Sequence, residues 1–522
     1  MDSSTILLHI HWTPQLVRLP SNTPALFVIL FALALWFVLN RATADRSIPT
    51  IKSSKAWFST RQDFAAHGVE IIEKGFKQVK SGVFRVTALD GSDLVLISPD
   101  HWLAICKKKD EEVSPALKEF FHCELHGAPF EEPFLYEYLR SRMPGFEDRY
   151  LDVISEALDE GLCSILGQGV DYSAEKCKRV IVQPQILHIY SHVIWRVILG
   201  SDFKPEAVEI FEQYSATLIP VMKKLKAQIP IVARITAAFS SEVRHVNALL
   251  ERATTLFTPI FERCIQVLEQ GSPNNSSVDK EWFEELIRMA PVEKRHDYKF
   301  LTNILIGFAF TFVFSPGPST TQIVYEFAFR PDYIDQVLEE AHEVLGERSE
   351  DWNFTRDNLR GLSLLDSFCK ETHKHHPTAA SNLMKKVHKT QTLPNGIVLP
   401  AGTILEVVMT AAHLSNPTLQ NPAEWNGRRY HDLRQRMSPA ATGSNKYDWG
   451  SATRDDVNFG YASHMCPGRW AGCSIAKMLL IKLLAKYQIR PEDGVTERYK
   501  DLHLGQYITP DPTKHILFRP KY

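Results

Sequence analysis

The residues with the clearest chemical potential in this chain lie at positions 459–469, which read FGYASHMCPGR. Cys466 lies in a loop bounded by glycine and proline, directly before an apolar-periodic segment that predicts a helix. A helix N-terminus lowers the pKa of a thiol, because the helix dipole and free backbone N–H groups stabilise the thiolate. Gly468 lets the backbone approach a flat cofactor closely. A Cys-Pro-Gly sequence alone would equally fit a buried cysteine beside a helix cap.

The whole segment resembles the haem-binding loop of the cytochrome P450 family, F-x-x-G-x-[RH]-x-C-P-G-R, in its fungal secondary-metabolism form. The matching positions are Phe459, His464, Cys466, Pro467, Gly468 and Arg469. The resemblance implies haem b, with the Cys466 thiolate as axial ligand of the iron and His464 donating to a propionate. Thiolate ligation favours O–O cleavage.

A second match lies upstream, where residues 364–376 predict a helix that ends before Pro377. Glu371 and Lys374 are three residues apart and therefore share a helix face. Seen alone, the two fit a surface ion pair. The family has a Glu-x-x-Arg helix that locks onto a second arginine, and the resemblance places Arg429 in that role. Lys374 departs from the family arginine and loses its planar fork, which weakens bidentate pairing.

The haem loop itself departs from the family at Ala462, four residues before the cysteine. The family has glycine there, at a tight bulge. An alanine is tolerable at this position only if its φ stays negative.

The predicted central helix departs further from the family pattern. Residues 298–314 are apolar almost throughout, which predicts a buried helix. In the family this helix carries an acid or histidine followed by threonine, a pair that relays protons to oxygen. Alignment backwards from Pro331 places Phe314 at the acid position and Ser315 at the threonine position. Ser315 keeps a hydroxyl for a proton relay without an acid beside it. Pro316 and Pro318 predict a break or strong kink.

The N-terminal region predicts a membrane anchor. Residues 24–39 contain no charged or polar side chain. Their helix would span about 24 Å, and flanking residues extend it toward the roughly 27 Å core of the endoplasmic reticulum membrane. Basic residues follow the segment, which places the bulk of the chain in the cytosol. We therefore predict a short lumenal N-terminus at 1–22, a single transmembrane anchor at 23–40 and a catalytic domain at 41–522.

Two alternatives concern the membrane. A cleaved signal peptide is disfavoured because no basic region directly precedes the apolar run and no clear small-residue cleavage site follows it. A second span at 301–314 would lack a basic flank and a partner span.

The composition narrows the class of protein. The chain has 522 residues and a net charge of -2 without a basic block, which excludes nucleic acid as a partner. Its eight cysteines form no CxxC pair, which is untypical of a disulfide framework. The pattern predicts a predominantly helical α+β fold without βαβ alternation, and the resemblance implies that this is the cytochrome P450 fold. Expected strands lie at 83–98 and 386–408, and expected helices at 180–199, 470–487 and 207–269, the last with breaks at Pro220, Pro230 and Pro259.

The resemblance implies a membrane-bound monooxygenase. It would take electrons from NADPH-cytochrome P450 reductase, split O2 and oxidise a lipophilic intermediate such as a terpenoid, alkaloid or polyketide. The missing acid supports one alternative, and the three departures together support another. One is a haem-thiolate isomerase, dehydratase or peroxide-using enzyme, and the other is a degenerate relative without catalysis.

Overall fold

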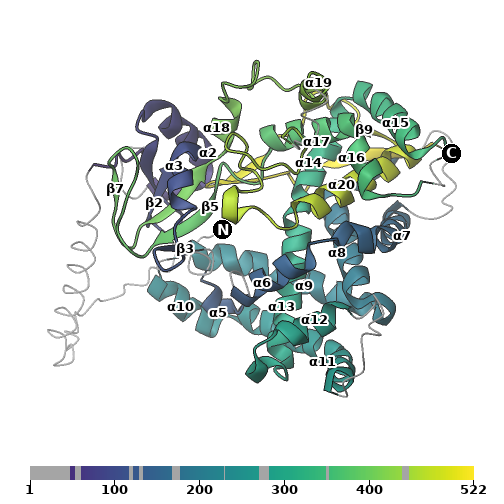
Figure 1. Cartoon of the computed structure of the whole chain (residues 1–522), viewed down its shortest axis with the longest axis horizontal. Coiled ribbons are helices and arrows are strands. Elements are labelled where there is room, and N and C mark those ends of the chain that lie inside the picture. Colours follow the sequence, from purple (N-terminus) through teal and green to yellow (C-terminus); the bar gives the residue numbers. More distant parts are fainter. Residues whose placement is uncertain are drawn as a thin grey trace, which may run out of the picture. The chain divides into compact units, whose positions relative to one another are not determined.

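The computed structural model describes residues 47–52, 60–116, 122–128, 133–166, 177–228, 230–269, 281–348, 352–437 and 446–521. The predicted anchor at 23–40 lies outside these residues. Everything from Ile48 onward groups into one structural unit, and Figure 1 traces its elements by colour along the chain.

A five-stranded mixed sheet lies beside α2 (Thr60–Gln78) and α3 (Pro99–Ile105) in this unit (Figure 1). Its strand order is β1-β2-β8-β5-β3, and only β2 and β8 run parallel. The strands are β1 (Val83–Thr87), β2 (Asp93–Ile97), β8 (Ile404–Val408), β5 (Ser381–Val387) and β3 (Val113–Pro115). The predicted hairpin at 83–98 is confirmed, with Gly91 at φ 85° in its turn.

The other strands of the described residues form three smaller sheets. They are β4 (Lys178–Ile181), β12 (His515–Pro520) and β9 (Tyr487–Pro491); β10 (Leu502–Leu504) with β11 (Tyr507–Thr509); and β6 (Gln391–Thr392) with β7 (Val398–Leu399). The predicted strands at 386–408 are therefore present as β6, β7, β8 and the end of β5.

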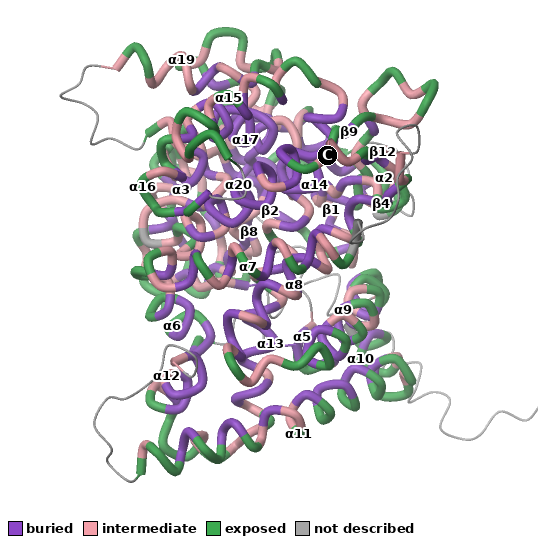
Figure 2. Tube along the Cα trace, turned by 90° about the vertical axis from the view of Figure 1, so that its right-hand side faces the viewer, coloured by how far each residue is buried: buried purple, intermediate pink, exposed green. Residues whose placement is uncertain are grey.

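Helices dominate the rest of the unit, as the composition predicts. They are α5 (Cys123–His126), α6 (Pro133–Arg142), α7 (Phe146–Leu166), α8 (Val182–Leu199), α9 (Pro205–Lys226), α10 (Pro230–Phe239), α11 (Ser241–Glu269), α12 (Glu281–Met289), α13 (Tyr298–Phe314), α14 (Pro316–Phe329), α15 (Asp332–Leu345), α16 (Arg356–Gly361), α17 (Ser363–His375), α18 (Thr410–Leu414), α19 (Arg429–Gln435) and α20 (Arg469–Lys486). Burial is densest around α14, α17 and α20 (Figure 2).

Two of the three expected proline breaks are wrong. Pro220 lies inside α9 and Pro259 lies inside α11, whereas only Pro230 begins a helix. An interior proline costs about 3 kcal/mol. Burying a large apolar side chain returns about 1.5–3 kcal/mol, and Leu218 and Phe261 are both fully buried near these prolines. Tertiary packing therefore outweighs the local penalty.

The predicted interruption of the central helix is confirmed, but the helical course continues. The single residue between α13 and α14 is Ser315, whose φ of -88° and ψ of -56° are still helical. Pro316 stands at the first position of α14, where its missing N–H is not needed.

Within the described residues, Tyr298–Phe329 is the one stretch long and apolar enough to cross a membrane. It packs against α8 and α11, and Leu301 and Leu305 have no exposed surface. These contacts favour a core helix over a second membrane span.

Candidate active site

The loop before α20 closes on itself through its backbone. The Cys466 amide donates to the Phe459 carbonyl at 2.8 Å. Gly460 adopts φ 78°, and a Cβ there would lie 2.1 Å from the His464 carbonyl oxygen. Glycine is therefore the residue that fits this position, and the loop holds Cys466 directly before the N-terminus of α20.

Ala462 also adopts a positive φ, of 54°. The expectation of a negative φ is therefore wrong. Ala462 begins a 3-10 turn through His464, in which the His464 amide donates to the Tyr461 carbonyl at 3.2 Å. This turn requires the left-handed conformation where the family has glycine. For an alanine that conformation costs roughly 1–2 kcal/mol.

The Cys466 thiol does not show the lowered pKa that a helix N-terminus predicts. The residue is exposed, yet enough protein surrounds its sulfur for burial to raise the pKa of the thiol. The amides of Gly468 and Arg469 and the Arg469 charge act in the opposite direction without outweighing burial. Arg469 also donates to the Cys466 carbonyl at 2.9 Å. Coordination to a metal deprotonates a thiol outright and reverses this balance.

A basic group lies beside the loop. The Lys385 ammonium is 3.3 Å from Nδ1 of His464, and the His464 ring lies 5.9 Å from that of Trp102. Burial lowers the pKa of His464, and the charges of Lys385 and Arg140 lower it further. Lys385 of β5 and Arg140 of α6 therefore bring positive charge beside the loop, and such charge would pair with the carboxylates of a haem. With the Cys466 thiol, this donor set fits haem b.

A cavity of about 920 Å³ lies along the junction of α13 and α14. Phe310, Thr311, Phe314 and Ser315 line it from one helix face. No Asp or Glu of the described residues lines it, and no residue of the 459–469 loop does. Thr311 was not predicted from the sequence, although its spacing of four from Ser315 indicates a shared helix face. The Thr311 hydroxyl donates to the Gly307 carbonyl at 2.9 Å.

Glu371, Lys374 and Arg429 meet in one buried cluster. Nε of Arg429 donates to both Glu371 carboxylate oxygens at 3.0 and 3.1 Å, and the Lys374 ammonium lies 3.0 Å from the same carboxylate. The Asn426 amide adds a hydrogen bond of 2.9 Å. Burial acts to raise the pKa of Glu371, but the His375 ring, Lys374 and Arg429 together lower it.

Lys374 reaches a second acceptor beyond Glu371. Its ammonium donates to the Pro422 carbonyl at 2.7 Å. Burial lowers the pKa of Lys374 to about 8, and the attraction of Glu371 only partly opposes this. The Arg429 guanidinium contributes further bonds to the carbonyls of Gln420, Asn421 and Glu424. The segment 420–429 is therefore tied to α17 although residue 374 lacks the arginine fork.

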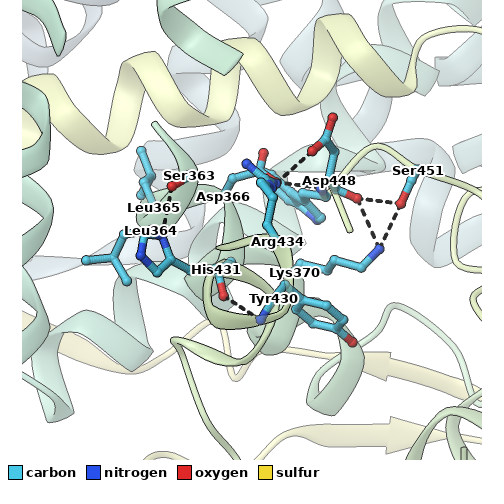
Figure 3. Close-up of polar contacts among 12 residues, drawn as sticks. Ser363, Leu364, Leu365, Asp366, Lys370, Tyr430, His431, Arg434, Asp448 and Ser451 are labelled. Atoms are coloured by element: carbon cyan, nitrogen blue, oxygen red, sulfur yellow. Dashed lines mark hydrogen bonds and ion pairs between the residues drawn. The ribbon is translucent and has the colours of Figure 1, made fainter. Parts of the chain in front are cut away.

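The network continues toward the Cys466 loop, and Figure 3 shows its α17 and α19 part. The Lys370 ammonium contacts the Asp456 carboxylate at 2.5 Å and the Ser451 hydroxyl at 3.1 Å. His373, whose pKa burial lowers to about 4, accepts from the Trp449 indole at 3.2 Å and packs edge-on against Phe459. Phe459 thus connects α17 to the loop.

Comparisons with known proteins indicate the family of this chain. The family profile described as Cytochrome P450 matches residues 146–517. Cytochrome P450 monooxygenase 103 of Postia placenta is 24% identical over 96% of this chain and 99% of its own length. Cytochrome P450 monooxygenase braC of Annulohypoxylon truncatum is 26% identical over 64% of this chain and 66% of its own length. Ent-kaurene oxidase of Gibberella intermedia is 24% identical, covering 88% and 85%.

The profile covers the central helices, the Glu371 cluster and the Cys466 loop. The chain therefore belongs to the cytochrome P450 family of haem-thiolate oxidoreductases, whose cofactor is haem b.

Proposed function

We propose that this protein is a membrane-anchored monooxygenase that oxidises a lipophilic secondary-metabolite intermediate, such as a terpenoid, alkaloid or polyketide. Cys466 is the axial ligand of the haem iron in this proposal. Phe459 and Gly468 shape the loop behind the ligand, and His464 and Arg469 neutralise or orient the cofactor. When bound, thiolate-ligated haem supplies the chemistry that cleaves O2.

The cavity is the observation that carries the proposal. Its volume of about 920 Å³ is near the upper end for small-molecule sites. Phe310 and Phe314, Leu135 and Leu139 give it apolar walls, which bind a hydrocarbon skeleton by excluding water. A named relative, ent-kaurene oxidase, acts on such a skeleton by its printed name.

Ser315 is proposed to relay protons at the cavity face. The residue is exposed and lines the cavity, one turn from the Thr311 hydroxyl. Hydroxyl groups both donate and accept hydrogen bonds, so that each can pass on a proton delivered by water. Phe314 offers no such group, so that the relay would depend on water or on a substrate hydroxyl.

The second candidate is a haem-thiolate isomerase, dehydratase or peroxide-using enzyme. The specific observation in its favour is the lack of a carboxylate among the described residues that line the cavity. Such an enzyme has no need to deliver protons to oxygen from a protein acid.

The membrane anchor at 23–40, the endoplasmic reticulum location and NADPH-cytochrome P450 reductase as electron donor are parts of the same proposal. The apolar sequence at 24–39 and the basic residues after it support a single span with the catalytic domain in the cytosol.

The test uses the full chain in membranes together with the reductase, NADPH and candidate lipophilic substrates. We expect NADPH-dependent O2 uptake and one labelled oxygen atom in the product when isotopic O2 is supplied. Conversion of a substrate under nitrogen without NADPH would favour the isomerase or dehydratase. Conversion that requires added peroxide alone would favour the peroxide-using enzyme.

A further inference from the structure

Two chain segments form one end of the cavity and hydrogen-bond to each other. We call residues 378–382 and 504–509 the paired wall. The Ala380 amide donates to the Gln506 carbonyl at 2.8 Å, and the Ile508 amide donates to the Thr378 carbonyl at 2.9 Å. The cavity is lined here by Thr378, Ala379, Asn382, Leu504, Tyr507, Ile508 and Thr509.

Glu406 of β8 lies behind the paired wall and holds both of its segments. The Ser381 hydroxyl donates to one carboxylate oxygen at 2.5 Å, and the Gln506 amide nitrogen donates to the other at 3.2 Å. All three side chains are at most 2% exposed. Each carboxylate oxygen of Glu406 therefore accepts a hydrogen bond from a different segment of the paired wall.

The carboxyl group has no ion pair within the described part of the chain. The charged group that acts on it is Lys226 of α9, and that ammonium lies 2.7 Å from Asp90. The phenol of Tyr507 also faces it, and burial followed by the Glu406 charge raises the pKa of that phenol. A buried carboxylate with neutral partners is costly. Burial accordingly raises the pKa of Glu406 to about 7, against the hydrogen bonds and Lys226.

We propose that Glu406 is a positioning residue that sets how firmly the paired wall closes the substrate cavity, through the gain or loss of one proton. The ionised carboxylate accepts from both donors and ties the segments together. In the protonated carboxyl group one oxygen carries a hydrogen. That oxygen is a weaker acceptor for its donor, so the two segments of the paired wall are held together less firmly. The inference rests on the proposed function in one respect, that this cavity receives the substrate.

The first experiment uses the haem-loaded full chain in membranes and two iron-binding probes, pyridine and the bulkier 4-benzylpyridine. The ratio of their dissociation constants cancels effects on the haem itself. We expect 4-benzylpyridine to bind at least about threefold more tightly, relative to pyridine, below the titration midpoint than above it, with the midpoint near pH 7. Glu406→Gln should make the ratio independent of pH.

Two further variants sharpen this experiment. Ser381→Ala removes a bond that stabilises the carboxylate, so that the midpoint should rise. Glu343→Gln, at an exposed position on α15, should leave the wild-type profile unchanged. A flat ratio in wild type, or an unchanged midpoint in Glu406→Gln, overturns the proposal.

Thermal unfolding tests, independently of haem, whether Glu406 titrates. Its folded pKa of about 7 exceeds the ordinary value of 4.5. Wild type therefore loses stability as the pH rises through this window, because the folded state releases its proton later than the unfolded state. Glu406→Gln should raise the Tm relative to wild type above about pH 7 and much less below about pH 5. Parallel Tm profiles overturn the proposal even if the pyridines reveal no haem and the proposed function fails.

Discussion

The Cys466 side and the cavity side of this protein are built by opposite means. Around the loop, buried charges meet in a redundant network in which Glu371 receives hydrogen bonds from Arg429, Lys374 and the Asn426 amide. Along the cavity, apolar side chains form most of the lining, and the α13–α14 face offers two hydroxyl groups, Thr311 and Ser315.

This difference indicates how each region accommodates departures from the family sequence pattern. On the loop side a departure from the family pattern must be compensated by fixed neighbours, as Pro422 does for Lys374. On the cavity side Phe314, which the family resemblance places at the acid position, packs against Phe211 and Phe310. The Glu371 cluster is thus fixed by several buried hydrogen bonds, whereas the cavity face is fixed mainly by apolar packing.

The largest effect is expected from Glu371→Ala. The change leaves Arg429 and Lys374 buried without their anion, and breaking such a cluster costs about 3–5 kcal/mol. We expect the free energy of unfolding in urea to fall by that amount and haem retention to fall with it. Glu339→Ala, at an exposed position on α15, is the control. A loss below about 1 kcal/mol would mean that the two regions do not differ in rigidity.

Lys374→Arg tests the environment of Lys374 through the pH dependence of the free energy of unfolding. The folded pKa of Lys374 is about 8 against an ordinary 10.5. The unfolded chain therefore binds more protons between these values, and wild type gains stability as the pH rises through them. Arginine stays protonated, so that the variant should lack this gain, which is at most about 3 kcal/mol.

The measurement is the difference in free energy of unfolding between Lys374→Arg and wild type at about pH 7 and about pH 10. Lys77→Arg at an exposed position of α2 is the matched control and should show no such trend. Equal differences at both pH values would show that Lys374 does not titrate in this window.

On the cavity side, Ser315→Ala should lower product formed per NADPH by about tenfold, equivalent to about 1.4 kcal/mol. This is less than the usual contribution of a general acid, because Thr311 and water remain. Ser319→Ala removes a buried hydroxyl that donates to the Ser315 carbonyl and serves as the control. An unchanged amount of product per NADPH in Ser315→Ala would exclude this residue as a proton relay.

The smallest effect is expected from Ala462→Gly. Relief of the positive φ stabilises the fold by about 1 kcal/mol, partly offset by the greater freedom of glycine in the unfolded chain. We expect a net gain of about 0.5 kcal/mol, measured as a small rise in Tm. Gly460→Ala should instead destabilise strongly, since its Cβ would lie 2.1 Å from the His464 carbonyl oxygen. A lower Tm for Ala462→Gly would show that the turn carries no strain.

Local spacing explains what could be predicted about the fold and the site. Glu371 and Lys374 share a helix face because they are three apart, and Cys466 precedes α20 because its loop contains glycine and proline. The hairpin at 83–98 follows from Asp90–Gly91 in its turn. Arg429 was reached only through the family pattern, since its contact with Glu371 spans 58 positions.

The features that could not be predicted depend on distant contacts. Lys385 and Arg140 reach His464 from β5 and α6, and no spacing in the sequence indicates this. The helix propensity of Pro220 and Pro259 is overridden by packing that only the folded chain supplies. The pKa of Cys466 likewise depends on how many atoms surround the sulfur, which a motif does not specify.

The most direct test of the account is the CO-difference spectrum of the reduced full chain in membranes, with Cys466→Ala and Cys473→Ala measured in parallel. Cys473 is a buried thiol in the second turn of α20 and controls for the loss of a cysteine. The account predicts a strongly red-shifted Soret band in wild type and Cys473→Ala and its loss in Cys466→Ala. A band that persists in Cys466→Ala, or its absence from well-folded wild type, would contradict Cys466 as the haem ligand.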